Sequence, residues 1–398
     1  MRESAQATLY KVAMPMTVRF DHPAKSRSAS DSLLLRLEID GATGIGECAP
    51  RAYVTGETTD SVTAALRSVP MDRVFSHVRA SEPSELLAAL LRGGVAGVFG
   101  VSGGNNVICL LETALLDLLG RRLGLPAEQL VPDTGAPQVS PAVLRISQVL
   151  DLSLDVEEFL ASHGPFHFVK IKASGDIGRD VRAVAAIRKH ISEQVLITVD
   201  ANMSWTREEA HGHLRRLRDS GADFVEEPLA KGDWEGLAQL RTEAVLGIML
   251  DESVCTPAQA RTAIKAGACD AFNVRVSKNG GPVTAARLID LARSNGIAFQ
   301  IGVQVAEVGP LINTGRALAF VHSDAMTVEA GQSDRFFPDA EMVVAPRPAV
   351  CRKTNTVLPP PGPGFGLHLT DRALSRASLH LAEGSAYWRP ISPEEHFV

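Results

Sequence analysis

Six charged residues recur at a nearly constant interval in the middle of the chain. They are Lys172, Asp200, Glu226, Asp251, Lys278 and Glu307, and successive members lie 25 to 29 residues apart. Each one ends or closely follows a short apolar segment, such as VLITVD or LGIMLD. One β-strand with its α-helix occupies about 25 to 30 residues, so the interval predicts a barrel of alternating strands and helices. In such barrels the carboxyl ends of the strands carry the catalytic residues.

Three of the six are carboxylates that end consecutive predicted strands. Asp200, Glu226 and Asp251 would therefore lie side by side on one rim. Hard oxygen ligands in this arrangement suit an octahedral Mg²⁺ that keeps open positions for a bound molecule. A single acid of this kind is more often a helix cap or a surface residue, but three in succession at the barrel interval favour a metal site.

Two lysines flank the predicted metal ligands. Lys172 precedes them by one strand and Lys278 follows them by one strand, so the ligands lie between two amines. A lysine that is partly desolvated and close to other cations loses proton affinity and can act as a base near neutral pH. Lys170, on the same side of its strand as Lys172, supplies such a nearby positive charge.

Composition narrows the class of protein. The chain has 398 residues with 45% hydrophobic content, enough for a barrel and one smaller domain. A formal net charge of −6 argues against nucleic acid or an anionic membrane as a partner. The five cysteines are scattered without a C-x-x-C pair, which is typical of a reducing compartment. No signal pattern or long apolar run is present, so we expect a cytoplasmic protein.

The order of local patterns predicts three parts. Residues 1–132 show strand alternation, a hairpin and a long helix at 106–123, and form an α+β domain whose loop at 51–58 can reach over a site. Residues 133–338 carry the barrel repeat. Residues 339–398 are rich in Pro and Gly, so we expect this tail to return as strands onto the first domain.

The motifs VKIK, VDAN, VEEP, LDES and VSKNGG resemble, in order and spacing, the barrel motifs of the enolase superfamily. The closer resemblance is to its muconate lactonizing enzyme subgroup, which includes muconate cycloisomerases, dipeptide epimerases, N-succinylamino acid racemases and o-succinylbenzoate synthases. IDGATGIGE and ETALLDLLGRRLGLP are similar to that family's N-terminal domain. The resemblance implies an α/β fold: a modified TIM barrel, (β/α)₇β, with an α+β capping domain built from the N-terminal segment and the C-terminal tail.

The resemblance also implies a chemistry. Mg²⁺, or Mn²⁺ in its place, would bind Asp200, Glu226 and Asp251, and Lys172 and Lys278 would act as acid and base on opposite faces of a small carboxylate substrate. Removal of the proton α to the carboxylate gives an enediolate that needs strong charge compensation. With both lysines present we expect an isomerase, either a racemase or epimerase or a cycloisomerase, and by resemblance a homo-oligomer.

Two other readings remain open at this stage. One is a lyase of the same superfamily, resembling o-succinylbenzoate synthase or an acid-sugar dehydratase. The other is a non-catalytic carboxylate-binding relic of the barrel. A metal hydrolase on a generic barrel is disfavoured because no His falls at these strand ends.

Further residues receive supporting roles. Glu307 matches the acid after the seventh strand of the subgroup, and either contacts the substrate carboxylate or orients a lysine. Asn202 and Glu252 are predicted to steer the ligands and lysines. Glu227 is interpreted as a helix-capping or surface acid. Candidate substrate contacts, on stretches that close over the site or enter it, are His22, Arg51, Tyr53 and Gln304.

The substrate is harder to predict. Arg51 or His22 could bind a second carboxylate. The paired aspartates that hold the substrate amino group in dipeptide epimerases are absent after the eighth strand, which reads TVEAGQSD, and only Glu329 or Asp334 could replace them.

Overall fold

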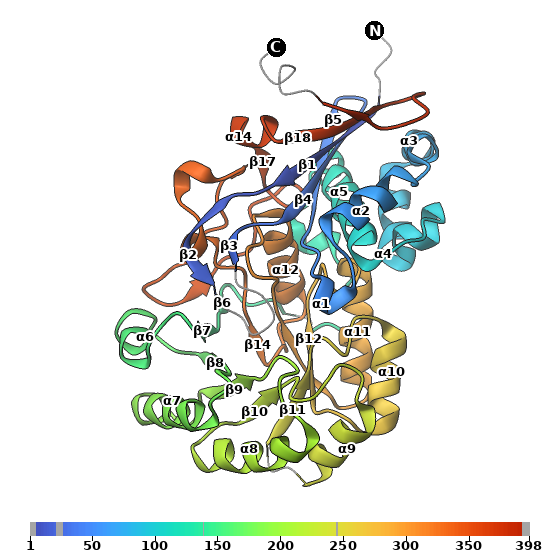
Figure 1. The fold of residues 1–398 in the computed structure, drawn as a ribbon. Coiled ribbons are helices and arrows are strands. Elements are labelled where there is room, and N and C mark those ends of the chain that lie inside the picture. Colours follow the sequence, from blue (N-terminus) through green and yellow to red (C-terminus); the bar gives the residue numbers. More distant parts are fainter. Residues whose placement is uncertain (1–4, 21–26, 138, 244–245, 392–398) are drawn as a thin grey trace.

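The computed structural model describes residues 5–20, 27–137, 139–243 and 246–391. It contains a barrel of parallel strands and a separate antiparallel sheet with its own helices (Figure 1). Among the described residues no helix is long and apolar enough to cross a membrane.

The barrel is an eight-stranded sheet in which all neighbours are parallel and follow chain order. Its strands are β7 (Gln148–Leu150), β8 (Phe168–Lys172), β9 (Leu196–Asp200), β10 (Phe224–Glu226), β11 (Gly247–Leu250), β12 (Ala271–Val274), β13 (Ala298–Ile301) and β14 (Thr327–Val328). The Ser147 amide donates a hydrogen bond of 2.9 Å to the Val328 carbonyl and thereby joins the two edges. The predicted TIM-like fold is confirmed.

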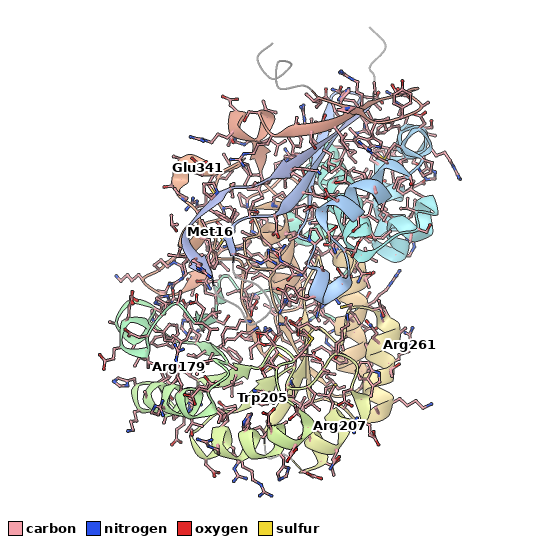
Figure 2. The ribbon with its side chains drawn as sticks, viewed as in Figure 1. Met16, Arg179, Trp205, Arg207, Arg261 and Glu341 are labelled. Atoms are coloured by element: carbon pink, nitrogen blue, oxygen red, sulfur yellow. The ribbon has the colours of Figure 1, made fainter. Side chains whose placement is uncertain are left out.

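Helices alternate with these strands and cover the outside of the barrel (Figure 1). They are α6 (Val156–Ser162), α7 (Ile177–His190), α8 (Arg207–Asp219), α9 (Trp234–Glu243), α10 (Pro257–Ala266), α11 (Pro282–Ser294) and α12 (Pro310–Val321). Three of these helices begin at residues whose side chains cap them. The Asp176 side chain caps α7, and Thr206 and Thr256 form capping boxes on α8 and α10. Side chains fill the barrel interior, and the buried Trp205 lies just before α8 (Figure 2).

The second sheet combines both ends of the chain, with the order β19-β18-β1-β4-β5. Its strands are β1 (Gln6–Val12), β4 (Ser32–Ile39), β5 (Ala42–Cys48), β18 (Ala377–Ala382) and β19 (Arg389–Pro390), and its helices are α2 (Thr59–Arg67), α3 (Met71–Ala80), α4 (Pro83–Phe99) and α5 (Asn105–Leu123). The blue N-terminal strands and the red strand β18 lie side by side in Figure 1. The expected capping domain from both ends of the chain is therefore present.

Close packing of α5 on β5 depends on two glycines. A Cβ at Gly44 would lie 2.2 Å from the Ala114 carbonyl oxygen, and one at Gly46 would lie 2.1 Å from the Leu110 carbonyl oxygen. Any larger residue would push the helix off the strand.

Short elements complete the chain. They are β2 (Pro15–Phe20), β3 (Arg27–Ala29), α1 (Ala52–Thr55), β6 (Leu144–Arg145), α13 (Ser333–Phe336), β15 (Val344–Ala345), β16 (Thr356–Val357), β17 (His368–Leu369), α14 (Asp371–Leu374) and the 3₁₀ turns η1 (Ala127–Leu130) and η2 (Asp339–Glu341).

Buried carboxylates of the capping domain bind the N-termini of two barrel helices. Glu47 accepts hydrogen bonds from the amides of Val308, Gly309 and Leu311 at the start of α12. Glu112 accepts from the Val283 amide at the start of α11 and from the Val95 amide. Free amides and the helix dipole favour a negative charge there, whereas burial raises the pKa of Glu112 to about 7.

Candidate active site

The three predicted metal ligands lie on adjacent strands of the barrel. Asp200 and Glu226 are the last residues of β9 and β10 and face each other in register, and Asp251 directly follows β11. All three are fully buried. The parallel sheet brings these ends together because its neighbours run in the same direction and end at the same edge.

Two cations contact this row of carboxylates. Lys170 Nζ lies 3.1 Å from Asp200 Oδ2 and 2.8 Å from Glu226 Oε2. Arg275, which follows β12, forms an ion pair with Asp251 and lies 3.7 Å from Glu226 Oε1. Burial opposes the charge on Lys170, but the surrounding carboxylates outweigh it and raise the pKa of Lys170 well above its usual value. We expected Lys170 as a nearby cation; sequence reasoning missed Arg275, although NVRVSK places it three residues before Lys278.

The two predicted catalytic lysines lie at opposite ends of the row. Lys172, the last residue of β8, has Nζ 2.6 Å from Asp200 Oδ2 and 3.2 Å from Asn202 Oδ1. Lys278 Nζ, beyond β12, donates to Asp251 Oδ1 and to the Asp251 carbonyl, both at 2.8 Å, and to the Asn273 carbonyl at 2.5 Å. Lys172 lines the cavity described below, whereas Lys278 is fully buried and does not line it.

Asn202 and Glu252 lie where they were expected, beside the carboxylates. The Asn202 amide donates to Asp200 Oδ1 at 3.1 Å, and its side chain donates to Glu252 Oε1 at 3.3 Å. Asn202 has a left-handed φ of 47°, which turns its side chain back toward the strand end. Neither residue lines the cavity.

The interpretation of Glu227 as a capping or surface acid is wrong. Its side chain is fully buried and accepts hydrogen bonds from the Asp251 amide at 2.8 Å, from the Ser253 amide at 3.1 Å and from the Ser253 hydroxyl. It thereby fixes the loop that carries Asp251. Burial raises the pKa of Glu227 to about 7.

A cavity of about 410 Å³ lies between the barrel mouth and the capping domain. This volume is in the range of small-molecule sites. Side chains from the barrel that line it include Lys170, Lys172, Arg275, Gln304, Glu307 and Glu329. Val18 and Tyr53 line it from the capping domain, and the wall near α6 and α13 includes Asp151, Glu158, His163, Gln332, Ser333 and Arg335.

Of the four candidate substrate contacts, Tyr53 and Gln304 line the cavity. Arg51 does not. Its side chain is fully buried, pairs with Asp31 at 2.6 Å and donates to the Val305 carbonyl at 2.6 Å. It therefore links the capping domain to the loop after β13, and its guanidinium has no access to a substrate. His22 lies outside the described residues.

Glu307 lines the cavity and accepts a hydrogen bond of 2.7 Å from the Gln304 amide. Burial, followed by the charge of Glu47, raises the pKa of Glu307 well above its usual value. The structure places no lysine against it among the described contacts, so the expected role of orienting a lysine gains no support.

The two acids considered as replacements for the missing aspartate pair are both engaged. Glu329 accepts from Lys170 at 3.1 Å, from Gln300 at 3.2 Å and from the Val303 amide at 2.8 Å. Asp334 pairs with Arg352 at 2.6 Å. Glu329 nevertheless lines the cavity, whereas Asp334 does not.

The donor chemistry of the row fits a divalent cation. Within the described residues no three acidic, His or Cys side chains form a preassembled metal site, and Lys170 and Arg275 contact the same carboxylates. Glu226 Oε2 is buried, and the Lys170 ammonium lies 2.8 Å from it. Burial and the neighbouring Asp200 raise the pKa of Glu226 to about 7. Oxygen ligands crowded in this way suit Mg²⁺, which would relieve their repulsion.

Comparison with known proteins identifies the family. Residues 151–373 match the family model described as "Enolase C-terminal domain-like". The chain belongs to the enolase superfamily. Its relatives place it in the muconate lactonizing enzyme subgroup, as the motifs indicated, and they include epimerases, racemases and muconate cycloisomerases.

Two relatives and one crystal structure show what kinds of protein the chain is similar to. The chain is 31% identical to a hydrophobic dipeptide epimerase of Citrifermentans bemidjiense, over 74% of this chain and 79% of that protein. It is 29% identical to an N-succinylamino acid racemase of Amycolatopsis sp., over 83% and 86%. A crystal structure of a dipeptide epimerase from Cytophaga hutchinsonii, complexed with Mg and the dipeptide D-Ala-L-Val, has the same fold, with a TM-score of 0.77 at 21% identity over 96% of this chain and 100% of that one.

Proposed function

We propose that this protein is a Mg²⁺-dependent isomerase that removes the proton α to a substrate carboxylate, and that it is a racemase or epimerase. The observation that supports this most strongly is the order of groups along the sheet. Lys172 on β8 precedes, and Lys278 beyond β12 follows, the three buried carboxylates on β9, β10 and β11. An amine at each side of one carboxylate-binding centre can serve both faces of a planar intermediate.

In this proposal Asp200, Glu226 and Asp251 hold the cation. Bound Mg²⁺ would neutralise the substrate carboxylate and so make the adjacent C–H more acidic. Lys172 stands at the cavity surface, where it can accept the proton directly and give the enediolate a compensating charge. Lys278 would return a proton on the other face after its ammonium leaves the Asn273 carbonyl.

Other cavity residues would orient the substrate. Gln304 lies at the cavity and its side-chain oxygen accepts from Arg275 at 3.1 Å, which leaves its amide NH₂ able to donate to a substrate oxygen. Tyr53 and Val18 close the cavity from the capping domain and would exclude water from the basic intermediate. Glu307, which burial favours in its neutral form, could then donate a hydrogen bond to a carboxylate.

Proton NMR in D₂O tests the proposal. The Mg²⁺-loaded protein is incubated with dipeptides, N-acyl amino acids, lactones and hydroxy acids, and loss of the α-proton signal is followed for each enantiomer. We expect exchange for at least one carboxylate class, and we expect Lys172→Ala and Lys278→Ala each to abolish exchange of a different enantiomer. Lys265→Ala, on the exposed surface of α10, is the matched control. If the same enantiomer still exchanges its α-proton in both Lys172→Ala and Lys278→Ala, the assignment is refuted.

One observation favours a second candidate, a lyase. Lys278 is saturated by three acceptors and lies off the cavity, whereas Lys172 is at its surface. Elimination of a β-leaving group from the enediolate needs only one base. In that case Lys278→Ala would keep exchange and product formation while Lys172→Ala loses both. A non-catalytic relic would bind Mg²⁺ by calorimetry and exchange no α-proton in any compound.

A further inference from the structure

Arg275 lines the cavity on the side of the carboxylate row opposite Lys172. It directly follows β12, and Lys172 ends β8, so β9, β10 and β11 with their three carboxylates lie between the two side chains. Arg275 shares a face of its strand with Asn273, two residues earlier, as Lys172 does with Lys170. Asn273 and Lys170 both donate to Glu226 Oε1, at 2.7 Å and 3.0 Å. The two strands therefore present matching pairs of polar side chains to the row.

The loop after Arg275 keeps Lys278 buried. The Arg275 amide donates to Asn279 Oδ1 at 2.9 Å, and the Asn279 amide donates to the Arg275 carbonyl at 3.0 Å. Asn279 Nδ2 also donates to the carbonyls of Val254 at 3.0 Å and Cys255 at 3.2 Å. These bonds close a turn in which Arg275 reaches the cavity and Lys278 does not. Of the two basic side chains on this loop, Arg275 is the one that a bound substrate can contact directly.

The guanidinium of Arg275 has hydrogens available for a ligand. Its Nη1 donates to Gln304 Oε1 at 3.1 Å, and its Nη2 pairs with Asp251. The residue is 6% exposed, and its Nε has no hydrogen-bond partner among the described residues. A buried N–H without an acceptor carries a desolvation cost that an oxygen of the substrate would remove. Arg275 also shares Asp251 with the proposed cation, so metal binding would weaken this ion pair and free further hydrogens.

A guanidinium and an amine differ in the chemistry that they can perform. The guanidinium stays protonated in proteins, so Arg275 cannot accept the α-proton, but it can donate two parallel hydrogen bonds to oxygens. In the proposed reaction Lys172 takes the α-proton as a neutral amine and becomes an ammonium. The electron pair of the C–H bond forms the C=C bond of the enediolate, and negative charge moves onto the carboxyl oxygens. Donors fixed where this charge develops stabilise the transition state most.

We propose that Arg275 is a further catalytic residue, which donates hydrogen bonds to the enediolate oxygens on the side opposite Lys172 and itself transfers no proton. This inference rests on the proposed function, because it concerns the intermediate of the same reaction. Isomerisation and elimination both pass through the enediolate, so the role holds for either. The alternative is that Arg275 only balances the charge of Asp251. Its removal would then alter the affinity for Mg²⁺ but not the discrimination between an enediolate-like anion and an ordinary carboxylate.

Binding of an enediolate analogue tests this role without turnover. Acetohydroxamate and phenylacetohydroxamate present two oxygens on a planar centre, as the enediolate does, and acetate and phenylacetate are the matching carboxylates. Calorimetry at saturating Mg²⁺, after the Mg²⁺ affinity of each protein has been measured, gives the ratio of carboxylate Kd to hydroxamate Kd. Arg275→Met should lower this ratio about 10- to 100-fold, and Arg275→Lys, which keeps the charge but not the paired donors, should lower it less. Arg261→Met, on the exposed surface of α10, is the matched control and should leave the ratio unchanged.

Melting temperature and circular dichroism establish that each variant is folded, and if Arg275→Met does not fold, a ratio in Arg275→Lys equal to that of the parent contradicts the role. An unchanged ratio in Arg275→Met, or a parent that binds neither hydroxamate more tightly than its carboxylate, would overturn the inference. In the D₂O assay, Arg275→Met should lower the kcat of exchange about 100- to 1,000-fold, with a smaller change in KM. Exchange at the parental rate contradicts the role of Arg275 but leaves the isomerase standing. An Arg275-dependent ratio without exchange in any compound does the reverse.

Discussion

The buried carboxylate of Glu112 should make the stability of this protein depend on pH in a way that one substitution removes. Glu112 joins the capping helix α5 to the start of α11, directly after the loop that carries Lys278. Burial raises its pKa from 4.5 to about 7. The folded state therefore binds this proton more tightly than the unfolded state, and the contribution to stability is complete below pH 4.5 and is lost as the pH rises through about 7.

The size of the effect follows from the shift. Each pKa unit corresponds to about 1.4 kcal/mol, so a shift from 4.5 to about 7 gives at most about 3 kcal/mol. Glu112→Gln cannot titrate. Its amide also presents an NH₂ group to one of the two donor amides, which costs stability equally at every pH. Relative to the parent, the variant should therefore gain about 3 kcal/mol between pH 4.5 and pH 7.5.

Urea unfolding at pH 4.5, 5.5, 6.5 and 7.5, with EDTA present and ionic strength constant, measures this difference. Other buried carboxylates titrate in both proteins and cancel in the comparison. Glu157→Gln, an exposed acid on α6, should give a curve parallel to the parent. If Glu112→Gln is also parallel to the parent over the whole range, Glu112 has an ordinary pKa in the folded protein and the argument from burial is refuted.

Three further changes test other contacts. Arg275→Met removes a cation that contacts the same carboxylates as the proposed metal, so the melting temperature in EDTA should fall. The increase in melting temperature on adding Mg²⁺ should be larger than in the parent. An increase equal to that of the parent would show that Arg275 does not compete with the metal. Arg51→Met should lower the free energy of unfolding in urea by about 2 to 3 kcal/mol, below the range for a fully buried pair because Asp31 partly contacts water. Gly281→Ala places an alanine at a φ of 99° with its Cβ 2.4 Å from Glu112 Oε1. The free energy of unfolding should fall by about 1 to 3 kcal/mol, and exchange on the Lys278 face should be lost. Values equal to those of the parent would show that the loop adapts.

The residues at the barrel rim could be predicted from the sequence because their position depends on where the strands end and not on the conformation of the loops. Any polar residue at the carboxyl end of a parallel strand reaches the same edge, whatever the loops do. Asp200, Glu226 and Asp251 needed only the correct interval. The return of the tail to the capping domain was also predictable, since a segment rich in Pro and Gly forms short strands more readily than helices.

What the sequence could not provide were the directions of individual side chains. Glu227 follows a strand residue that faces inward, so alternation alone would turn it outward. Its φ of 39° instead turns it beneath the next loop. Arg51 and Arg335 present the same difficulty: both are cations in polar segments, but one is buried against Asp31 and the other lines the cavity. Such differences depend on contacts between elements that are separate in the sequence, such as Arg51 with Val305, 254 positions away, and Arg335 with Gln148, 187 positions away, and no local pattern contains them.

The pairing of β18 with both β19 and β1 has a consequence for how the chain is made. During synthesis the ribosome releases β1 long before β18, so the edge of β1 that pairs with β18 stays unpaired until Ala377–Ala382 have emerged. The barrel strands are all available before then. The nascent chain can thus assemble its barrel while the sheet that covers it is still incomplete, and translation that stops before residue 377 leaves an exposed edge strand that other chains can join.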